Sequence, residues 1–322
     1  MKSLCIMLPF VIIGLMNCYS TDPQVDADAP TTSVLAAEKF KFRYELNKPD
    51  RTMELPGKLD EISGLGMSTY KTLLCAIQDE KGIVFFVDKK SGKIREEVQF
   101  WKDGDYEGVE VVGDDVFVVK STGTVYEIRK LATSQQEVLK YNSFLGREND
   151  VEGLCYDEKN QRLLLACKGK PATGESLETL RFKKVIYSFD LKSKALDPEP
   201  AYSITLDQIQ AYLKRHPNIE KRDKFMEYFA PDKSNLDFNP SAIAIHPKTG
   251  NLYLTSSVGK VIMVLSPKGK LLYIGKLEKK IHPQPEGIVF DDDGGMYISN
   301  EGKNGKARIH YFKAQANRMK DN

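Results

Sequence analysis

The sequence predicts an all-β domain of the β-propeller class, and three observations lead to this expectation. A short motif, made of a serine or glutamate, a small residue and an aliphatic residue, recurs five times in the 322 residues. Its first positions, 63, 107, 152, 241 and 286, lie 44, 45, 89 and 45 residues apart, and about 45 residues is the length of one four-stranded propeller blade. Each copy opens an alternating apolar run that ends in a polar turn, which is typical of a hairpin.

The five copies share their order and their flanking residues. They are Ile62-Ser63-Gly64-Leu65, Tyr106-Glu107-Gly108-Val109, Val151-Glu152-Gly153-Leu154, Pro240-Ser241-Ala242-Ile243 and Pro285-Glu286-Gly287-Ile288. Further strands are expected at 73–77, 83–88, 116–119, 125–128, 163–166, 185–190, 251–255, 296–299 and 307–312. A single blade exposes two apolar faces, so it must stack on its neighbours around an axis.

The double-length interval between positions 152 and 241 leaves two readings open. It is close to the length of two blades, so six blades are the alternative to five. However, residues 206–214 and 219–229 have the apolar spacing of helices. We therefore predict five blades with a helical insertion around residues 206–230.

Closure of the ring is expected from the N-terminal side of the domain. Residues 39–46 alternate charged and apolar side chains with the period of a half-buried strand. A strand there, paired with the last blade, would remove an exposed sheet edge. The propeller domain is expected over residues 38–315, followed by a tail at 316–322.

The first 18 residues have the composition of an export signal. Lys2 precedes an apolar run from Leu4 to Met16 that is too short to cross a bilayer comfortably. The run ends at Cys18 in a sequence that resembles the lipobox of bacterial lipoproteins, although Asn17 stands where a small residue is usual. An ordinary signal peptide is the alternative. Residues 19–37 are polar, as a flexible tether would be, so we expect an exported outer-membrane lipoprotein that faces the periplasm or the surface.

Charge and cysteine content exclude several other classes. The chain has 47 basic and 45 acidic residues, distributed evenly, which gives no electrostatic basis for nucleic-acid binding. Cys75, Cys155 and Cys167 lie in apolar runs and are expected to be small buried residues rather than disulfide partners. Only four histidines and no Cys-x-x-Cys pair give a zinc site little support.

The repeated carboxylates are the candidate functional residues. If Glu107, Glu152 and Glu286 each open an innermost strand, radial symmetry brings them to one end of the central channel. Three such charges repel one another and need a cation, protonation or a basic partner. The alternative for each glutamate is a structural role, in which its carboxylate holds backbone amides. Glu301 follows a strand of the last blade and is a further candidate ligand.

The ordered set of five motifs resembles the SdiA-regulated family over approximately residues 40–315. The resemblance implies a five-bladed propeller distantly similar to NHL repeats, with a bound calcium ion and no established activity. It places the candidate calcium ligands at Glu107, Glu152 and Glu286, with Ser63 and Ser241 at the matching places of the other two blades. Calcium suits such a site because it takes six to eight oxygen ligands in irregular geometry.

Three functions are compatible with the sequence. The first is a monomeric, lipid-anchored and calcium-binding propeller that serves as a binding or scaffold module for an envelope protein or a small molecule. The second is a metal-dependent hydrolase, lactonase-like or a phytase-like phosphoesterase, with its metal in the channel. The third is a structural surface lipoprotein with an empty channel.

Overall fold

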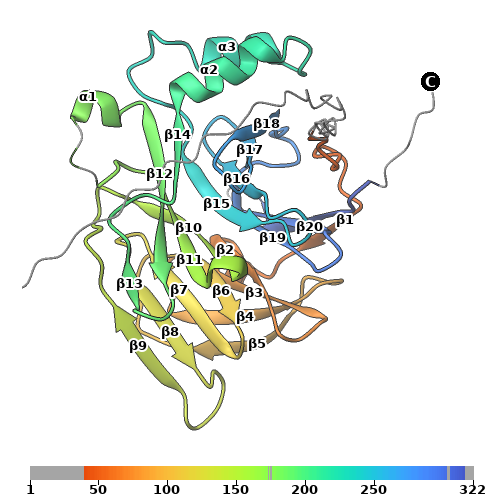
Figure 1. Cartoon of the computed structure of the whole chain (residues 1–322). Helices are drawn as coiled ribbons and strands as arrows, with labels where there is room; N and C mark the ends of the chain where they lie inside the picture. Colours follow the sequence, from red (N-terminus) through yellow and green to blue (C-terminus); the bar gives the residue numbers. More distant parts are fainter. Residues whose placement is uncertain (1–39, 173, 175, 303–304, 316–322) are drawn as a thin grey trace, which may run out of the picture. The chain divides into compact units, whose positions relative to one another are not determined.

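Five β-sheets follow one another along the chain, and each sheet is one blade of a propeller (Figure 1). The computed structural model describes residues 40–172, 174, 176–302 and 305–315. The predicted signal peptide at 1–18, the tether at 19–37 and the tail at 316–322 lie outside these residues. The prediction of five blades is confirmed.

Each of the first four blades is built from strands that are consecutive in sequence. Blade 1 contains β2 (Ile62–Met67), β3 (Leu73–Gln78), β4 (Ile83–Asp88) and β5 (Ile94–Gln99). Blade 2 contains β6 (Tyr106–Val112), β7 (Asp115–Lys120), β8 (Val125–Arg129) and β9 (Glu137–Tyr141). Blade 3 contains β10 (Val151–Asp157), β11 (Arg162–Cys167), β12 (Lys183–Asp190) and β13 (Ala195–Leu196), with β14 (Tyr202–Thr205) also paired to β12. Blade 4 contains β15 (Pro240–Ile245), β16 (Leu252–Ser256), β17 (Val261–Leu265) and β18 (Leu271–Lys276).

Blade 5 joins the two ends of the domain. It contains β19 (Pro285–Phe290), β20 (Met296–Asn300), β21 (Arg308–Phe312) and β1 (Arg51–Glu54). Strand β1 is antiparallel to β21, from Arg51 opposite Tyr311 to Glu54 opposite Arg308. The blade therefore has no unpaired edge at β21, and the ring is closed by one N-terminal strand.

The expected location of the closing strand is wrong. Residues 40–45 form no strand, and the closing strand β1 begins only at Arg51. Tyr44 and Leu46 are instead buried between blades 4 and 5, and the Tyr44 hydroxyl donates a hydrogen bond of 2.7 Å to the carbonyl oxygen of Gly294. The alternating pattern thus reflects one buried side of an irregular segment and not membership of a sheet.

The innermost strands form a closed ring of neighbours. Consecutive contacts join β2 to β6, β6 to β10, β10 to β15, β15 to β19 and β19 back to β2. These strands gather at the centre of the view in Figure 1. The five copies of the sequence motif are the first residues of these five strands.

The glycine of the motif is explained by this packing. A Cβ atom on Gly108 would lie 2.5 Å from the Cβ of Leu154 in the next blade, and one on Gly287 would lie 2.7 Å from the Cβ of Leu65. Larger side chains at these positions would push neighbouring innermost strands apart. Blade 4 tolerates Ala242 at the equivalent position.

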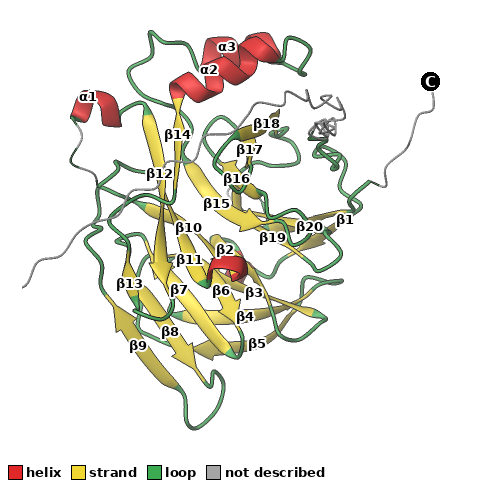
Figure 2. Ribbon diagram, in the orientation of Figure 1, coloured by secondary structure: helices red, strands yellow, loops and turns green. Residues whose placement is uncertain are grey.

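The double-length interval contains one blade and a helical insertion, as predicted. The long helices are α2 (Leu206–Arg215) and α3 (Arg222–Tyr228), and a short α1 (Leu177–Leu180) precedes β12. Helix α2 starts with a capping box, in which the Thr205 hydroxyl accepts from the Gln208 amide at 3.2 Å. Its apolar face packs on β14 and β18, outside the ring of innermost strands (Figure 2).

The remaining short turns and the cysteines are as follows. Two 3-10 turns lie at Gly57–Leu59 and Glu158–Asn160. Cys75, Cys155 and Cys167 are free and buried, as expected. Within the described part of the chain, no helix is both long and apolar enough to cross a bilayer.

Candidate functional site

Each innermost strand carries a β-bulge at the same position. The antiparallel register to the second strand skips one residue in every blade, and the skipped residues are Ser63, Glu107, Glu152, Ser241 and Glu286. A bulged residue is unpaired in the ladder, and the bulge re-aims its side chain. The five motif residues are therefore equivalent in three dimensions as well as in sequence.

The three glutamates of the set line one small cavity. Glu107, Glu152 and Glu286 border it together with the glycine or alanine that follows each bulge, and its volume is about 10 Å³. A cavity of roughly 10–15 Å³ is the smallest that holds one water molecule. The structure thus brings the three predicted carboxylates to one end of the channel, around a space the size of a water molecule or a bare ion. We call this place the channel mouth.

Ser63 and Ser241 have a different role from the glutamates in this structure. The Ser63 hydroxyl donates 2.6 Å to the carbonyl oxygen of Tyr106, and the Ser241 hydroxyl donates 2.5 Å to that of Pro285. Each carbonyl belongs to the residue directly before a bulged glutamate in the next blade. Both serines therefore fix the backbone that carries a carboxylate, and their place among the metal ligands stays a prediction.

A lysine that sequence reasoning missed also lies at the channel mouth. The Nζ of Lys168 is 2.6 Å from Oε1 of Glu152 and 3.5 Å from Oδ2 of Asp150. Burial lowers the pKa of Lys168, but the nearby charge of Glu152 outweighs this effect and holds the pKa above its usual value. Lys168 is thus the basic partner that one of the three repelling carboxylates requires.

Lys168 belongs to a second set of equivalent positions. The residue that directly follows the second strand of each blade lies at the same end of its blade as the bulge, and these residues are Asp79, Ser121, Lys168, Ser257 and Glu301. Glu301, predicted as a ligand, is a member of this set. Aligning the ends of the five second strands would have revealed the whole set from the sequence.

Among the described residues, neither of the other two bulged glutamates has an equally close cation. Glu286 is buried and Glu107 is half-buried. Burial, followed by repulsion from Glu152 and Asp105, raises the pKa of Glu107 to about 10. Burial, followed by repulsion from Glu152 and Glu301, raises the pKa of Glu286 to about 8. Burial and the neighbouring carboxylates therefore favour the neutral form of both carboxyls unless positive charge is added.

Two further residues, also missed from the sequence, orient these carboxyls. Asp105 forms a hydrogen bond with the side chain of Glu107, and the Ser121 hydroxyl donates to Oδ2 of Asp105. Ser257 forms a hydrogen bond with the side chain of Glu286. The glutamate side chains are thus oriented by polar neighbours from their own blade or the one before it.

The donor chemistry of the mouth suits a hard cation. All of its candidate ligand atoms are carboxylate, hydroxyl or carbonyl oxygens, which calcium prefers. As the side chains stand, no three His, Cys, Asp or Glu residues in the described part of the chain are close enough together to hold a metal. The contact between Lys168 and Glu152 also uses a carboxylate oxygen that a cation would need.

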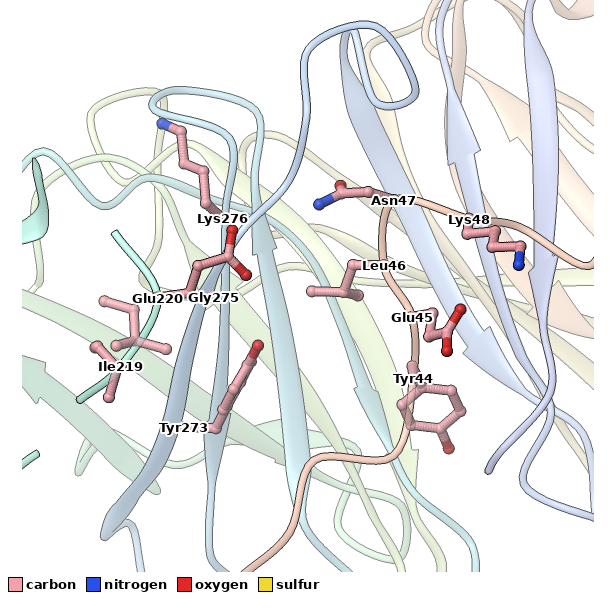
Figure 3. Close-up of a pocket in the computed structure, with 11 residues that line it drawn as sticks. Tyr44, Glu45, Leu46, Asn47, Lys48, Ile219, Glu220, Tyr273, Gly275 and Lys276 are labelled. Carbon is pink, nitrogen blue, oxygen red and sulfur yellow. The ribbon is translucent and has the colours of Figure 1, made fainter. Parts of the chain in front are cut away.

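An acidic cavity of about 620 Å³ lies where blades 1 and 5 meet. Its lining includes Glu61, Asp79, Glu80 and Glu301. A separate cavity of about 530 Å³ lies at the outer edge of blade 4, and its lining includes Tyr44, Leu46 and Tyr273 of β18 (Figure 3).

A family model described as SdiA-regulated matches residues 36–304, which is most of the chain. The chain belongs to the SdiA-regulated family. The resemblance drawn from the five motifs is therefore confirmed. No curated protein matches this member of the family.

Several solved structures are similar to the chain at low identity. Glutaminyl cyclase of Myxococcus xanthus matches with 10% identity and a TM-score of 0.53, over 83% of this chain and 96% of that one. The PQQ-bound aldose sugar dehydrogenase of Streptomyces coelicolor matches with 11% identity and a TM-score of 0.47, over 83% and 98%. A Bacteroides thetaiotaomicron protein of unknown function matches with 14% identity and a TM-score of 0.45, over 83% and 61%. At 10% identity, the likeness to the glutaminyl cyclase concerns the fold alone.

Proposed function

We propose that this SdiA-regulated protein is a monomeric cell-envelope lipoprotein whose propeller binds calcium at the channel mouth. In this role it serves as a binding or scaffold module for an envelope protein or a small molecule. The observation that carries the proposal is the convergence of three bulged glutamates on one ion-sized cavity. Burying three ionised carboxylates together is costly unless positive charge compensates them.

The residues of the mouth divide into ligands and supports. Glu107, Glu152 and Glu286 would hold the calcium ion, and Glu301 would add a fourth carboxylate from the second set. Bound calcium would supply the positive charge that allows these carboxylates to be ionised together. Ser63 and Ser241 support the site through the backbone of the neighbouring blades.

The anchor is proposed from the leader sequence. Cys18 follows a short apolar run, and the polar residues after it have the composition of a tether. A lipid on Cys18 would place the propeller at the outer membrane, on the periplasmic or the surface side. Calcium at millimolar concentrations is bound by extracellular protein modules, so weak calcium affinity would suit this location.

Calorimetric titration of calcium into the chelated protein tests the proposal. We expect saturable heat for the wild type and its loss in Glu107→Gln and Glu286→Gln, which keep the size of each side chain and remove its charge. Glu96→Gln, an exposed carboxylate on β5, is the matched control and should bind as the wild type does. Absence of saturable heat in the wild type would reject calcium binding by the native chain.

A further inference from the structure

Hydrogen bonds hold the backbone at Lys168 in place. Its amide donates 2.8 Å to the carbonyl oxygen of Asp150, and its own carbonyl accepts from Nζ of Lys184. The following Gly169 donates 2.9 Å to the carbonyl oxygen of Asn149. These bonds hold the end of β11 against the loop before β10. The side chain beyond them remains about one-third exposed, at 35%.

The ammonium of Lys168 lies between two carboxylates of different depth. Glu152, at 2.6 Å, has a side chain that is 11% exposed, whereas Asp150, at 3.5 Å, has one that is 37% exposed. Glu152 belongs to the channel cavity, and Asp150 does not line it. The lysine therefore has an inner partner inside the proposed calcium site and an outer partner beside it.

A calcium ion and the Lys168 ammonium would compete for the same oxygen. Oε1 of Glu152 accepts the short contact from Nζ, and two cations cannot share one buried carboxylate oxygen without strong repulsion. Rotation of the lysine side chain toward Asp150 would free Glu152 without moving the fixed backbone. Asp150 would then still compensate the displaced ammonium.

We propose that Lys168 is a tethered cation that occupies Glu152 in the metal-free protein and moves to Asp150 when calcium binds. The inference rests on the proposed calcium function and adds a regulator to that site. Lys168 stabilises the metal-free mouth, and the calcium affinity is set by the exchange between the two carboxylates. Removing the lysine therefore strengthens calcium binding, and removing the outer partner weakens it.

A double-mutant cycle followed by calorimetric calcium titration tests the exchange. Lys168→Met removes the tethered charge and should tighten calcium binding by about tenfold, within the range of coupling seen for charges in one network. Asp150→Asn should weaken binding by about tenfold when Lys168 is present, because the displaced ammonium loses its partner. Asparagine tolerates the left-handed backbone of residue 150, whose φ is 47°.

The combined variant distinguishes movement of Lys168 between the two carboxylates from a direct electrostatic effect of the Asp150 charge on the calcium ion. In the Lys168→Met background, Asp150→Asn should change the calcium affinity by less than about threefold, since no ammonium needs the outer partner. Lys170→Met, an exposed lysine two residues away, controls for loss of positive charge and should bind as the wild type does. If Lys168→Met does not fold, Lys168→Gln keeps a donor for Glu152 and tests the same loss of charge.

The outcomes distinguish this inference from the calcium proposal. Equal weakening by Asp150→Asn in both backgrounds, or unchanged affinity in Lys168→Met, would overturn the tethered cation while leaving calcium binding intact. Binding in Lys168→Met but not in the wild type would support the tethered cation and reject calcium binding by the native chain. Absence of binding in every variant would overturn both.

Discussion

The Ser63 hydroxyl of blade 1 donates a 2.6 Å hydrogen bond to the carbonyl oxygen of Tyr106 in blade 2. Tyr106 is the residue directly before Glu107, so the bond joins one bulge to the next across a blade interface. Ser241 repeats the contact with Pro285, before Glu286. The two blades that lack a bulged carboxylate thus position the carboxylates of their neighbours.

Ser63→Ala should therefore destabilise the domain as well as weaken the site. It leaves a buried carbonyl oxygen without this donor, which costs about 1–3 kcal/mol in the free energy of unfolding. Denaturant unfolding measures the loss, with the exposed Ser134→Ala as a control near zero. Equal stability of the two variants would show that the bond between the blades contributes nothing measurable.

Gly108→Ala tests why the motif contains glycine. The new methyl would lie 2.5 Å from the Cβ of Leu154 and 3.0 Å from its amide nitrogen, so two innermost strands must separate. Overpacking of this kind costs about 1–3 kcal/mol. Gly146→Ala is the matched control, because nothing lies within 4 Å of its added Cβ. A thermal melt should show a lower Tm only for Gly108→Ala.

His282 should make the stability of the domain depend on pH. It is fully buried, its Nε2 donates 2.7 Å to the carbonyl oxygen of Leu46, and burial lowers its pKa to about 4. The unfolded chain takes up a proton at this histidine near pH 6.5, whereas the folded chain does so only near pH 4. The contribution of the buried neutral histidine to the free energy of unfolding is therefore fully present above pH 6.5. It is lost as the pH falls toward 4, by on the order of 3 kcal/mol.

Denaturant unfolding between pH 7 and pH 4.5 measures this dependence. The ring of His310 lies 5.5 Å from that of His282, and burial also lowers the pKa of His310. His310 therefore adds, in the same direction, to the slope of the free energy of unfolding against pH. His282→Gln should therefore reduce the slope without removing it. An unchanged slope in His282→Gln would show that this histidine is not the source.

Lipid attachment is expected to depend on Cys18 alone among the leader cysteines. Cys18→Ser should abolish incorporation of labelled fatty acid and release the protein from the membrane fraction. Cys5→Ser, in the apolar run of the same leader, should leave both unchanged. Equal labelling of the two variants would favour an ordinary signal peptide.

The sequence predicts the blades because symmetry makes one short motif visible five times. It misplaces the closing strand, since Arg51–Glu54 buries only Met53 deeply and shows little alternation, whereas residues 40–46 alternate without joining a sheet. Lys168 is missed for a related reason. A single lysine after a leucine-rich strand carries no signal until the ends of all five second strands are compared.

The most direct test of calcium binding at the channel mouth is a thermal melt after exhaustive chelation, with and without added calcium. A ligand that binds only the folded protein at one hundred times its Kd adds about 2.7 kcal/mol of stability. We predict a calcium-dependent rise in Tm for the wild type and none for the Glu107→Gln/Glu152→Gln double variant. An unchanged wild-type Tm, or an equal rise in both proteins, would contradict a calcium site formed by these glutamates.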